Sequence, residues 1–225
     1  MTVIDISKKG GKLGPNLVSE VSIAAKEYKV RVEGIKPLIM KHPRTADPTC
    51  AEARAIGALT SLKGKQRTLE VLNKISALEW EYALYTDGNG TVVLPTLWFW
   101  RSLCEGAKAT RQGQQMTFGM RIVEEFVPFI HDGPNTVAEL RNSPRNFFRT
   151  TLGNMDKRVA KTRPIFFDWS TEFTINVDPD AVNPKDVLTA LQTAGFRKGV
   201  GDGRGGAFAS IFGLYKVTHF QEVGE

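Results

Sequence analysis

The sequence predicts an α+β protein with a ferredoxin-like fold, in which helices cover one face of an antiparallel sheet and the core carries an inserted elaboration. First, Tyr28–Ile35 and Glu172–Val177 alternate apolar and polar side chains with the period of a half-buried strand. Second, a helix begins after Asn183, because Asn is a good N-cap and Pro184 suits the first helical position. Third, the predicted elements follow one another as two βαβ-like passages.

The region after the first strand predicts a loop, a helix and a hairpin. Met40–Thr49 is rich in proline and basic residues and is expected to be a loop, whereas Ala51–Ala77 is compatible with a helix. The alternating stretch Trp80–Leu84 leads into the sequence Asp-Gly-Asn-Gly at Asp87–Gly90. Because Asp-Gly and Asn-Gly tolerate the positive φ angles of tight turns, this pattern predicts a β-hairpin, and Pro95 ends its second arm.

An amphipathic helix follows the hairpin and is expected to run to about residue 110. Its apolar positions, three and four residues apart, are Leu97, Trp100, Cys104 and Ala107. Mixed signals between Arg111 and Arg163, with a strand around Phe126–Ile130, indicate an elaboration on the core. After the helix that begins at Asn183, Gly195 is expected to stop the helix, and a strand near Ile211–Val217 closes the fold.

These elements predict one domain over residues 28–217, with the insertion at about 111–163. Residues 1–27 are expected to form a flexible basic arm and residues 218–225 a C-terminal tail. The apolar run Thr91–Trp100 is too short for the roughly 20 residues of a membrane-spanning helix, so no membrane contact is expected. Cys50 and Cys104 have no disulfide or metal spacing, which favours the reducing cytoplasm.

The positive charge of the chain is concentrated in one segment. The formal net charge is +6, and seven cations against Asp156 alone give the segment between Arg141 and Arg163 that same excess. This distribution predicts contact with a polyanion. The cations expected to contact nucleic acid are Arg44, Arg141, Arg145, Arg149, Lys157, Arg158, Lys161 and Arg163.

Aromatic residues interleave or flank these cations, a combination typical of single-strand binding, in which bases stack on aromatic rings. The alternative is a solvated charged loop over a core strand whose aromatic side chains point inward. For Phe166, Phe167 and Trp169 the core interpretation is preferred, because they lead directly into the strand that starts near Glu172.

The glycine-rich loop Gly199–Gly206 contains a formal GxGxxG, but it follows a helix and precedes a strand. A dinucleotide-binding loop has the opposite order, which excludes the Rossmann interpretation. The loop is a flexible connector, a backbone approach to a phosphate chain, or a subunit contact. For the second of these, the expected binding residues are Gly201, Gly203 and Arg204.

No catalytic residue, metal site or cofactor is predicted. The histidines share no ligand spacing and are His42, His131 and His219. Asp87–Gly90 resembles a calcium loop, but Trp98 occupies the position of the bidentate glutamate. A role for His42 as a general acid or base on a phosphodiester is the lesser alternative, and its replacement by Ala is expected to leave binding and fold nearly unchanged.

Several segments resemble a known family. They are the opening strand Val30–Ile35, the Val93–Pro95 step into a helix, and the glycine-rich stretch Gly199–Gly213 before the last strand. Together they resemble the RAMP superfamily, RRM-like ferredoxin modules that include CRISPR backbone subunits. Arg163–Trp169, followed by Glu172–Ile175, is also similar to a group of uncharacterised bacteriophage proteins.

The resemblance implies a protein that binds RNA or single-stranded DNA along its sheet face and glycine loop. It also implies self-association into an oligomer or filament, with the insertion as a finger across the strand or against the next subunit. If the gene is from a phage, the expected location is the cytoplasm of the host cell. No cleavage centre is expected. Two alternatives remain: a structural or inhibitory protein whose basic face docks on an acidic protein, and a metal-dependent nuclease, which the shortage of clustered carboxylates disfavours.

Overall fold

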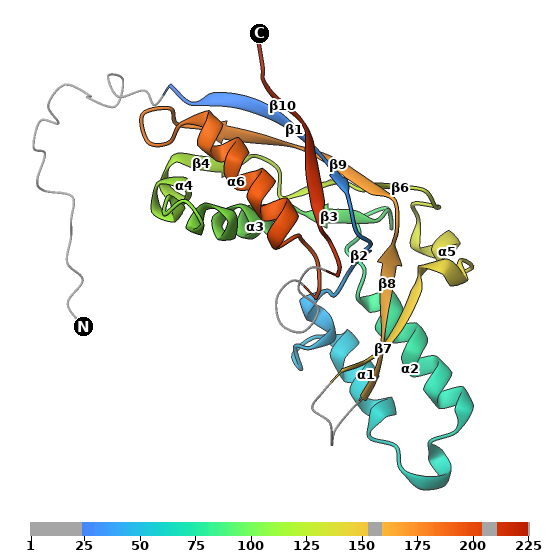
Figure 1. Ribbon diagram of the computed structural model, residues 1–225. Coiled ribbons are helices and arrows are strands. Elements are labelled where there is room, and N and C mark those ends of the chain that lie inside the picture. The colour runs from blue at the N-terminus through green and yellow to red at the C-terminus, as the bar shows by residue number, and fades with distance from the viewer. Residues whose placement is uncertain (1–23, 153–158, 204–210, 225) are drawn as a thin grey trace, which may run out of the picture.

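The computed structural model describes residues 24–152, 159–203 and 211–224, and its largest sheet is antiparallel (Figure 1). The strand order is β10-β1-β9-β4, and the short strand β6 (Ile130–His131) also pairs with β9. The bounds of the four main strands are β1 Lys26–Gly34, β4 Met120–Ile122, β9 Trp169–Val177 and β10 Tyr215–Glu222. The central strand β1 places Val30 opposite Phe173 of β9 and Val32 opposite Val217 of β10.

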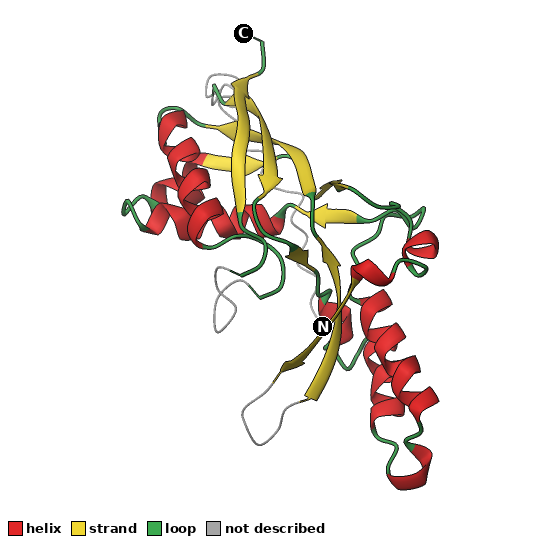
Figure 2. Cartoon of the chain, turned by 45° about the vertical axis from the view of Figure 1, so that its right-hand side comes forward, coloured by secondary structure: helices red, strands yellow, loops and turns green. Residues whose placement is uncertain are grey.

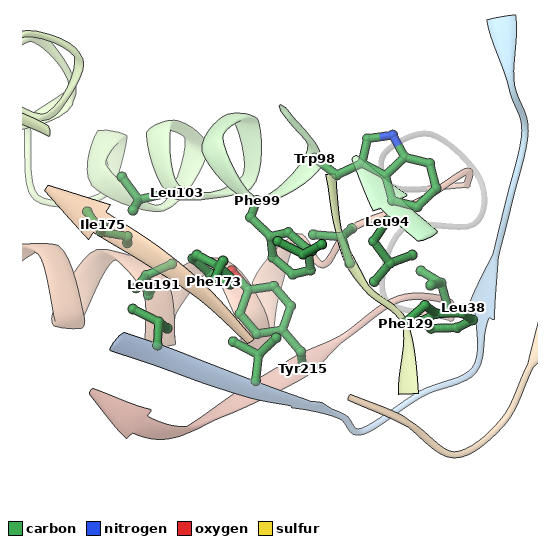
Figure 3. Close-up of a cluster of buried hydrophobic side chains, with 14 of the residues drawn as sticks. Leu38, Leu94, Trp98, Phe99, Leu103, Phe129, Phe173, Ile175, Leu191 and Tyr215 are labelled. Atoms are coloured by element: carbon green, nitrogen blue, oxygen red, sulfur yellow. The ribbon is translucent and has the colours of Figure 1, made fainter. Parts of the chain in front are cut away.

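Two helices, α3 (Leu97–Lys108) and α6 (Pro184–Arg197), pack together over one face of this sheet (Figure 1). In chain order, β1, α3, β4, β9, α6 and β10 form two βαβ passages, which confirms the predicted α+β, ferredoxin-like fold. Between helices and sheet lies an aromatic core, where the Phe99 ring stacks on Phe173 at 4.9 Å and meets the edge of Tyr215 at 5.9 Å (Figure 3).

A lobe projects away from this core (Figures 1 and 2). Its elements are β2 Leu38–Ile39, α1 Ala51–Thr60, α2 Leu69–Tyr82, β7 Phe147–Leu152 and β8 Val159–Phe166. β7 and β8 form an antiparallel pair, β2 adds to β8, and α2 packs along β8. The lobe is therefore built from two insertions, one between β1 and α3 and one between β4 and β9. Only the second was anticipated, and the expected range 111–163 also supplies β4 and β6 to the main sheet.

The remaining described elements are short. They are β3 Val93–Pro95, β5 Phe126–Pro128, α4 Gly113–Gly119, α5 Val137–Leu140, and the 3₁₀ turns Pro43–Thr45, Gly64–Gln66 and Pro144–Asn146. β3 and β5 pair antiparallel. The strand expected around Phe126–Ile130 is present as β5 and the start of β6.

The predicted hairpin was wrong in its first arm. The turn itself exists, because the Gly90 N–H donates to the Asp87 carbonyl at 3.2 Å and Thr86 bridges to Val92. The stretch Trp80–Leu84 is not a strand, since α2 continues through Tyr82. Tertiary burial, and not the local alternation, determines this conformation. Trp80 lies in the helix, and the centre of its ring is 4.5 Å from that of Phe147, on which it stacks.

Three other features differ from expectation. The buried face of α3 includes Trp98 and Phe99, which neighbour the predicted apolar positions, and the predicted Leu97 is half exposed. Gly195 lies inside α6, which ends at Arg197 before Gly199 adopts a φ of +66°. β10 runs to Glu222, so residues 219–222, which were assigned to a tail, pair with β1.

The close packing of α3 on α6 gives a stability prediction. A Cβ atom at Gly106 would lie 2.2 Å from the Ala190 carbonyl oxygen, so Gly106→Ala should force the helices apart and cost about 1–3 kcal/mol. Gly57→Ala in α1 is the matched control, because no heavy atom lies within 4 Å of its Cβ position. That change should stabilise by about 0.5–1 kcal/mol. Urea denaturation measures both, and equal midpoints for the two variants would contradict the packing argument.

Candidate nucleic-acid interface

A groove opens in the lobe between α2 and the β7–β8 pair, and it encloses about 300 Å³. Leu69 and Leu72 of α2 contribute apolar surface to it, and they are 74% and 41% exposed. The cationic residues of its lining are Arg67, Arg149 and Lys161. Exposed apolar and cationic groups thus share one groove, which suits a ligand that combines flat apolar faces with negative charge.

Two of these cations are available for a ligand. In the parts of the chain that the structure describes, Arg67 and Arg149 are exposed and have no carboxylate within ion-pair distance. Lys63 and Lys65 lie beside Arg67 in the connection between α1 and α2, and residues 61–68 contain no acid. The tip of the lobe is therefore cationic without internal neutralisation, a property that favours anion binding.

Lys161 is held by a buried carboxylate. Glu79 of α2 is only 4% exposed, and one of its oxygens accepts a bond of 2.5 Å from Lys161 Nζ. Its other oxygen accepts from the Thr162 N–H at 3.0 Å, so Glu79 fixes β8 against α2. Thr162 also shares a 2.7 Å hydroxyl contact with Ser76. Lys161 consequently lines the groove mainly as part of this structural network.

Arg44 has a structural role that the sequence did not suggest. Its Nε donates to the Tyr82 carbonyl and its Nη2 to the Leu84 carbonyl, both at 2.9 Å. Tyr82 is the last residue of α2 and Leu84 lies two residues beyond it, and carbonyls at a helix C-terminus lack intrahelical partners. Arg44 therefore caps α2 and is not free for phosphate.

Arg141 and Arg145 are exposed but paired. Arg141 Nη2 lies 2.5 Å from Glu81, and Arg145 pairs with Asp132 while its guanidinium lies 5.1 Å from the centre of the Phe167 ring. Exposed ion pairs contribute about 0–1 kcal/mol to the stability of the fold, so an arginine loses little free energy when it exchanges its carboxylate partner for a phosphate. Both residues remain accessible to a ligand. The inward positions expected for Phe166 and Trp169 are observed, whereas Phe167 is 38% exposed beneath Arg145.

Arg163 is buried and holds the glycine loop to the lobe. It is 5% exposed, and its Nε lies 3.1 Å from Asp202 Oδ2. Its Nη1 also donates to the Thr162 carbonyl at 3.1 Å. A guanidinium in this position supports the fold and does not reach a ligand at the surface.

The described part of the glycine loop packs against the protein itself. Gly201 has a φ of +85°, and a Cβ atom there would lie 2.6 Å from Leu38 Cδ1 and 2.7 Å from the Ile39 carbonyl oxygen. Glycine is required at position 201 because the backbone there packs directly on β2. Gly203, at φ +79°, also has a backbone conformation that favours glycine. Three of the predicted contacts, Lys157, Arg158 and Arg204, lie outside the described residues.

Charged side chains on the open face of the main sheet form ion pairs with one another. Arg31 pairs with Glu172 at 2.9 Å, and Lys216 pairs with Glu33 at 3.0 Å. On β1, β9 and β10 as described, no Phe, Tyr or Trp is exposed. RRM-type recognition stacks bases on exposed aromatic rings of the sheet. The lobe is therefore a better candidate interface than the sheet face that the resemblance implied.

Two histidines shape turns. His42 Nδ1 accepts from the Arg44 N–H and His131 Nδ1 from the Gly133 N–H, both at 3.1 Å. An accepting Nδ1 requires the neutral ring with its proton on Nε2. Burial lowers the pKa of both, and for His42 the nearby Arg44 lowers the pKa further. This arrangement does not favour the general acid or base role considered for His42.

Sequence reasoning missed Lys63, Lys65 and Arg67, because the larger cationic cluster after Arg141 dominates the charge distribution. The signal was present in the sequence as three cations within five residues and no acid between Thr60 and Leu69. What the sequence does not show is that this connection lies at the same groove as Arg149, since that depends on α2 packing along β8.

No family model matches this sequence, and no curated protein matches it either. Within the described ranges, no group of three or more His, Cys, Asp or Glu residues could hold a metal ion. No helix of those ranges is long and apolar enough to cross a membrane. Cys50 and Cys104 are both free thiols.

The burial of Arg163 predicts a loss of stability. Arg163→Ala should lower the free energy of unfolding by about 3 kcal/mol, because it breaks a buried ion pair. The loss is expected at the lower end of the usual range, because the remaining Asp202 carboxylate is partly exposed to water. Arg141→Ala removes the same charge from an exposed pair and should cost less than about 1 kcal/mol. Denaturant titration of both variants tests this, and a stable Arg163→Ala variant with weakened oligonucleotide binding would show that Arg163 contacts the ligand.

The two histidines that accept turn N–H groups predict acid sensitivity. Their pKa values are lowered in the folded state, so the unfolded chain binds more protons and stability falls as the pH drops below about 6.5. The double variant His42→Asn/His131→Asn keeps a side-chain acceptor for the turn N–H groups but does not titrate there. Its melting temperature should fall less than that of the wild type between pH 7 and 5.5. Parallel decreases in the two proteins would refute the assignment.

Proposed function

We propose that this protein binds single-stranded nucleic acid, RNA or DNA, in the groove between α2 and the β7–β8 pair. The observation that carries the proposal is that Arg67 and Arg149 share this groove with exposed Leu69 and Leu72 and have no acidic partner in the described parts of the chain. Guanidinium groups bind phosphates through charge-assisted hydrogen bonds. Apolar surface beside them suits the exposed face of an unpaired base, which a duplex hides.

The cationic surface continues from this groove across β7. Arg149 also lines a second hollow, whose other residues include Arg141, Pro144 and Phe147. A strand that follows the cations would pass from Lys63 and Lys65 at the tip, through Arg67 and Arg149, to Arg141. Several phosphates along one path give the additive electrostatic affinity that is characteristic of single-strand binding.

The proposed setting is an RRM-like module of the RAMP type, in the cytoplasm, where free Cys50 and Cys104 stay reduced. The fold agrees with that proposal but does not carry it, since ferredoxin-like folds host many functions. A basic lobe could equally dock on an acidic protein, and oligonucleotide binding decides between the two. Cleavage is not proposed, because the residues around the groove form no acid–base or metal-binding constellation in the described ranges.

The proposal predicts salt-dependent binding that depends on two arginines. Labelled single-stranded RNA, single-stranded DNA and duplex are titrated with protein at several salt concentrations. Each phosphate neutralised in a single strand contributes about 0.7 to the slope of log K against log salt. Arg67→Gln/Arg149→Gln should therefore lower the single-strand slope by about 1.4 and weaken binding at least tenfold at low salt.

The matched control is Lys108→Gln/Lys185→Gln, which removes the same charge from exposed positions on α3 and α6. It should bind nearly as the wild type does. Equal losses in both variants would indicate a response to net charge alone and would remove the groove from consideration. Affinity that is independent of salt for all three oligonucleotides would exclude nucleic acid as the ligand.

A further inference from the structure

β4 ends the main sheet, and in the described sheet no strand pairs with its outer edge. On its inner side the Val123 N–H donates to the Thr174 carbonyl at 3.0 Å. The Gly119 carbonyl accepts from the Asp178 N–H at 2.7 Å. Because antiparallel pairing alternates along a strand, the residue midway between these bonded positions and the next, Ile122, directs its N–H and carbonyl outward. The edge therefore offers one donor and one acceptor to an added strand.

An apolar groove of about 510 Å³ opens beside this edge. Its lining includes Leu97 and Trp100 of α3 together with Ile122 and Val123. Leu97 and Val123 are 50% and 53% exposed, and exposed apolar surface that gathers in one place marks an interaction site. Ile122 packs against the core on the side of the sheet that α3 covers. A side chain directly opposite Ile122 on an added strand would therefore point into the groove.

Two free charges lie four positions apart along the same edge. Arg121 and Glu125 both line the groove and are exposed, and neither forms an ion pair with the parts of the chain that the structure describes. Glu124 is already bonded, because its carboxylate accepts from the N–H and the hydroxyl of Thr174 at 2.9 and 2.7 Å. A complementary ligand thus carries an acidic group near Arg121 and a basic group near Glu125.

We propose that the β4 edge binds an extended segment of a partner protein, which adds to the sheet as an antiparallel strand and places an apolar side chain in the groove. One outward residue suffices for this, because directly opposed residues of an antiparallel pair can exchange both of their hydrogen bonds. The anchor residue of the segment bonds in this way to Ile122, and its side chain lies against Leu97 and Trp100.

The antiparallel direction defines the sequence of the segment. The residue after the anchor lies opposite Arg121 and is acidic, whereas a basic residue precedes the anchor on the side of Glu125. A backbone that donates and accepts at one residue is a property of peptides and not of nucleic acids. This proposal does not depend on nucleic-acid binding.

The probe is the blocked peptide acetyl-Lys-Thr-Thr-Phe-Asp-Thr-amide, in which phenylalanine is the anchor. Titrated to millimolar concentration into isotope-labelled full-length protein, it should shift the amide resonance of Ile122 and slow the hydrogen exchange of that amide. The same peptide N-methylated at phenylalanine lacks the N–H for the Ile122 carbonyl and should bind at least tenfold more weakly. Equal binding of the two peptides would overturn the strand pairing.

The groove is tested with Leu97→Ser, which should weaken peptide binding at least fivefold because it removes an exposed apolar contact of the anchor. Phe196→Ser is the matched control, since Phe196 is 72% exposed on α6 and does not line the groove. It should bind the peptide as the wild type does. A Leu97→Ser variant that also binds as the wild type does would overturn the groove as the anchor site.

The direction of the segment is tested by exchanging charges. The variant Arg121→Glu/Glu125→Lys should bind the probe at least fivefold more weakly than the wild type does. It should prefer the peptide in which lysine and aspartate are exchanged. The same preference in variant and wild type would overturn the proposed direction.

The same titrations reveal other occupants of the groove. Self-association of the peptide-free protein that Leu97→Ser abolishes would assign the groove to a second copy of the chain. Changes in the resonances of residues 1–23 when the peptide binds would assign it to the protein's own N-terminal segment. Either result, or no binding of the probe, would overturn the proposal regardless of the oligonucleotide results.

Discussion

The positions of Arg149 and Lys161 in the groove depend on how strand β8 is fixed between α2 and the glycine loop. On one side the buried carboxylate of Glu79 accepts from the backbone N–H of Thr162. On the other side the buried guanidinium of Arg163 pairs with Asp202. Buried polar groups of this kind are costly unless they are paired, so each bond defines one position of β8. Arg149 on the neighbouring strand reaches the groove only because β8 is held there.

The two insertions that build the lobe are joined to each other by the same principle. Trp80 Nε1 donates to the Asn146 carbonyl at 2.9 Å, and the Asn146 amide donates to the Ile165 carbonyl at 2.8 Å. These bonds link α2 to the start of β7 and to the end of β8. The ferredoxin-like core thus supplies a frame, and two insertions joined by buried hydrogen bonds supply the candidate site. Sites that are grafted on a shared fold in this way carry functions that the fold alone does not specify.

The sequence predicted the parts of the fold that local patterns determine. Alternation in β1 and β9 and the Asn183 cap of α6 are local signals, and all three are observed. The helical state of Trp80–Tyr82 was missed because the burial of Trp80 against Phe147 depends on a partner far along the chain. The roles of Arg44 and Arg163 were missed for the same reason. The sequence shows where cations cluster, but only the tertiary structure shows which of them already bond to carbonyls and carboxylates of the protein.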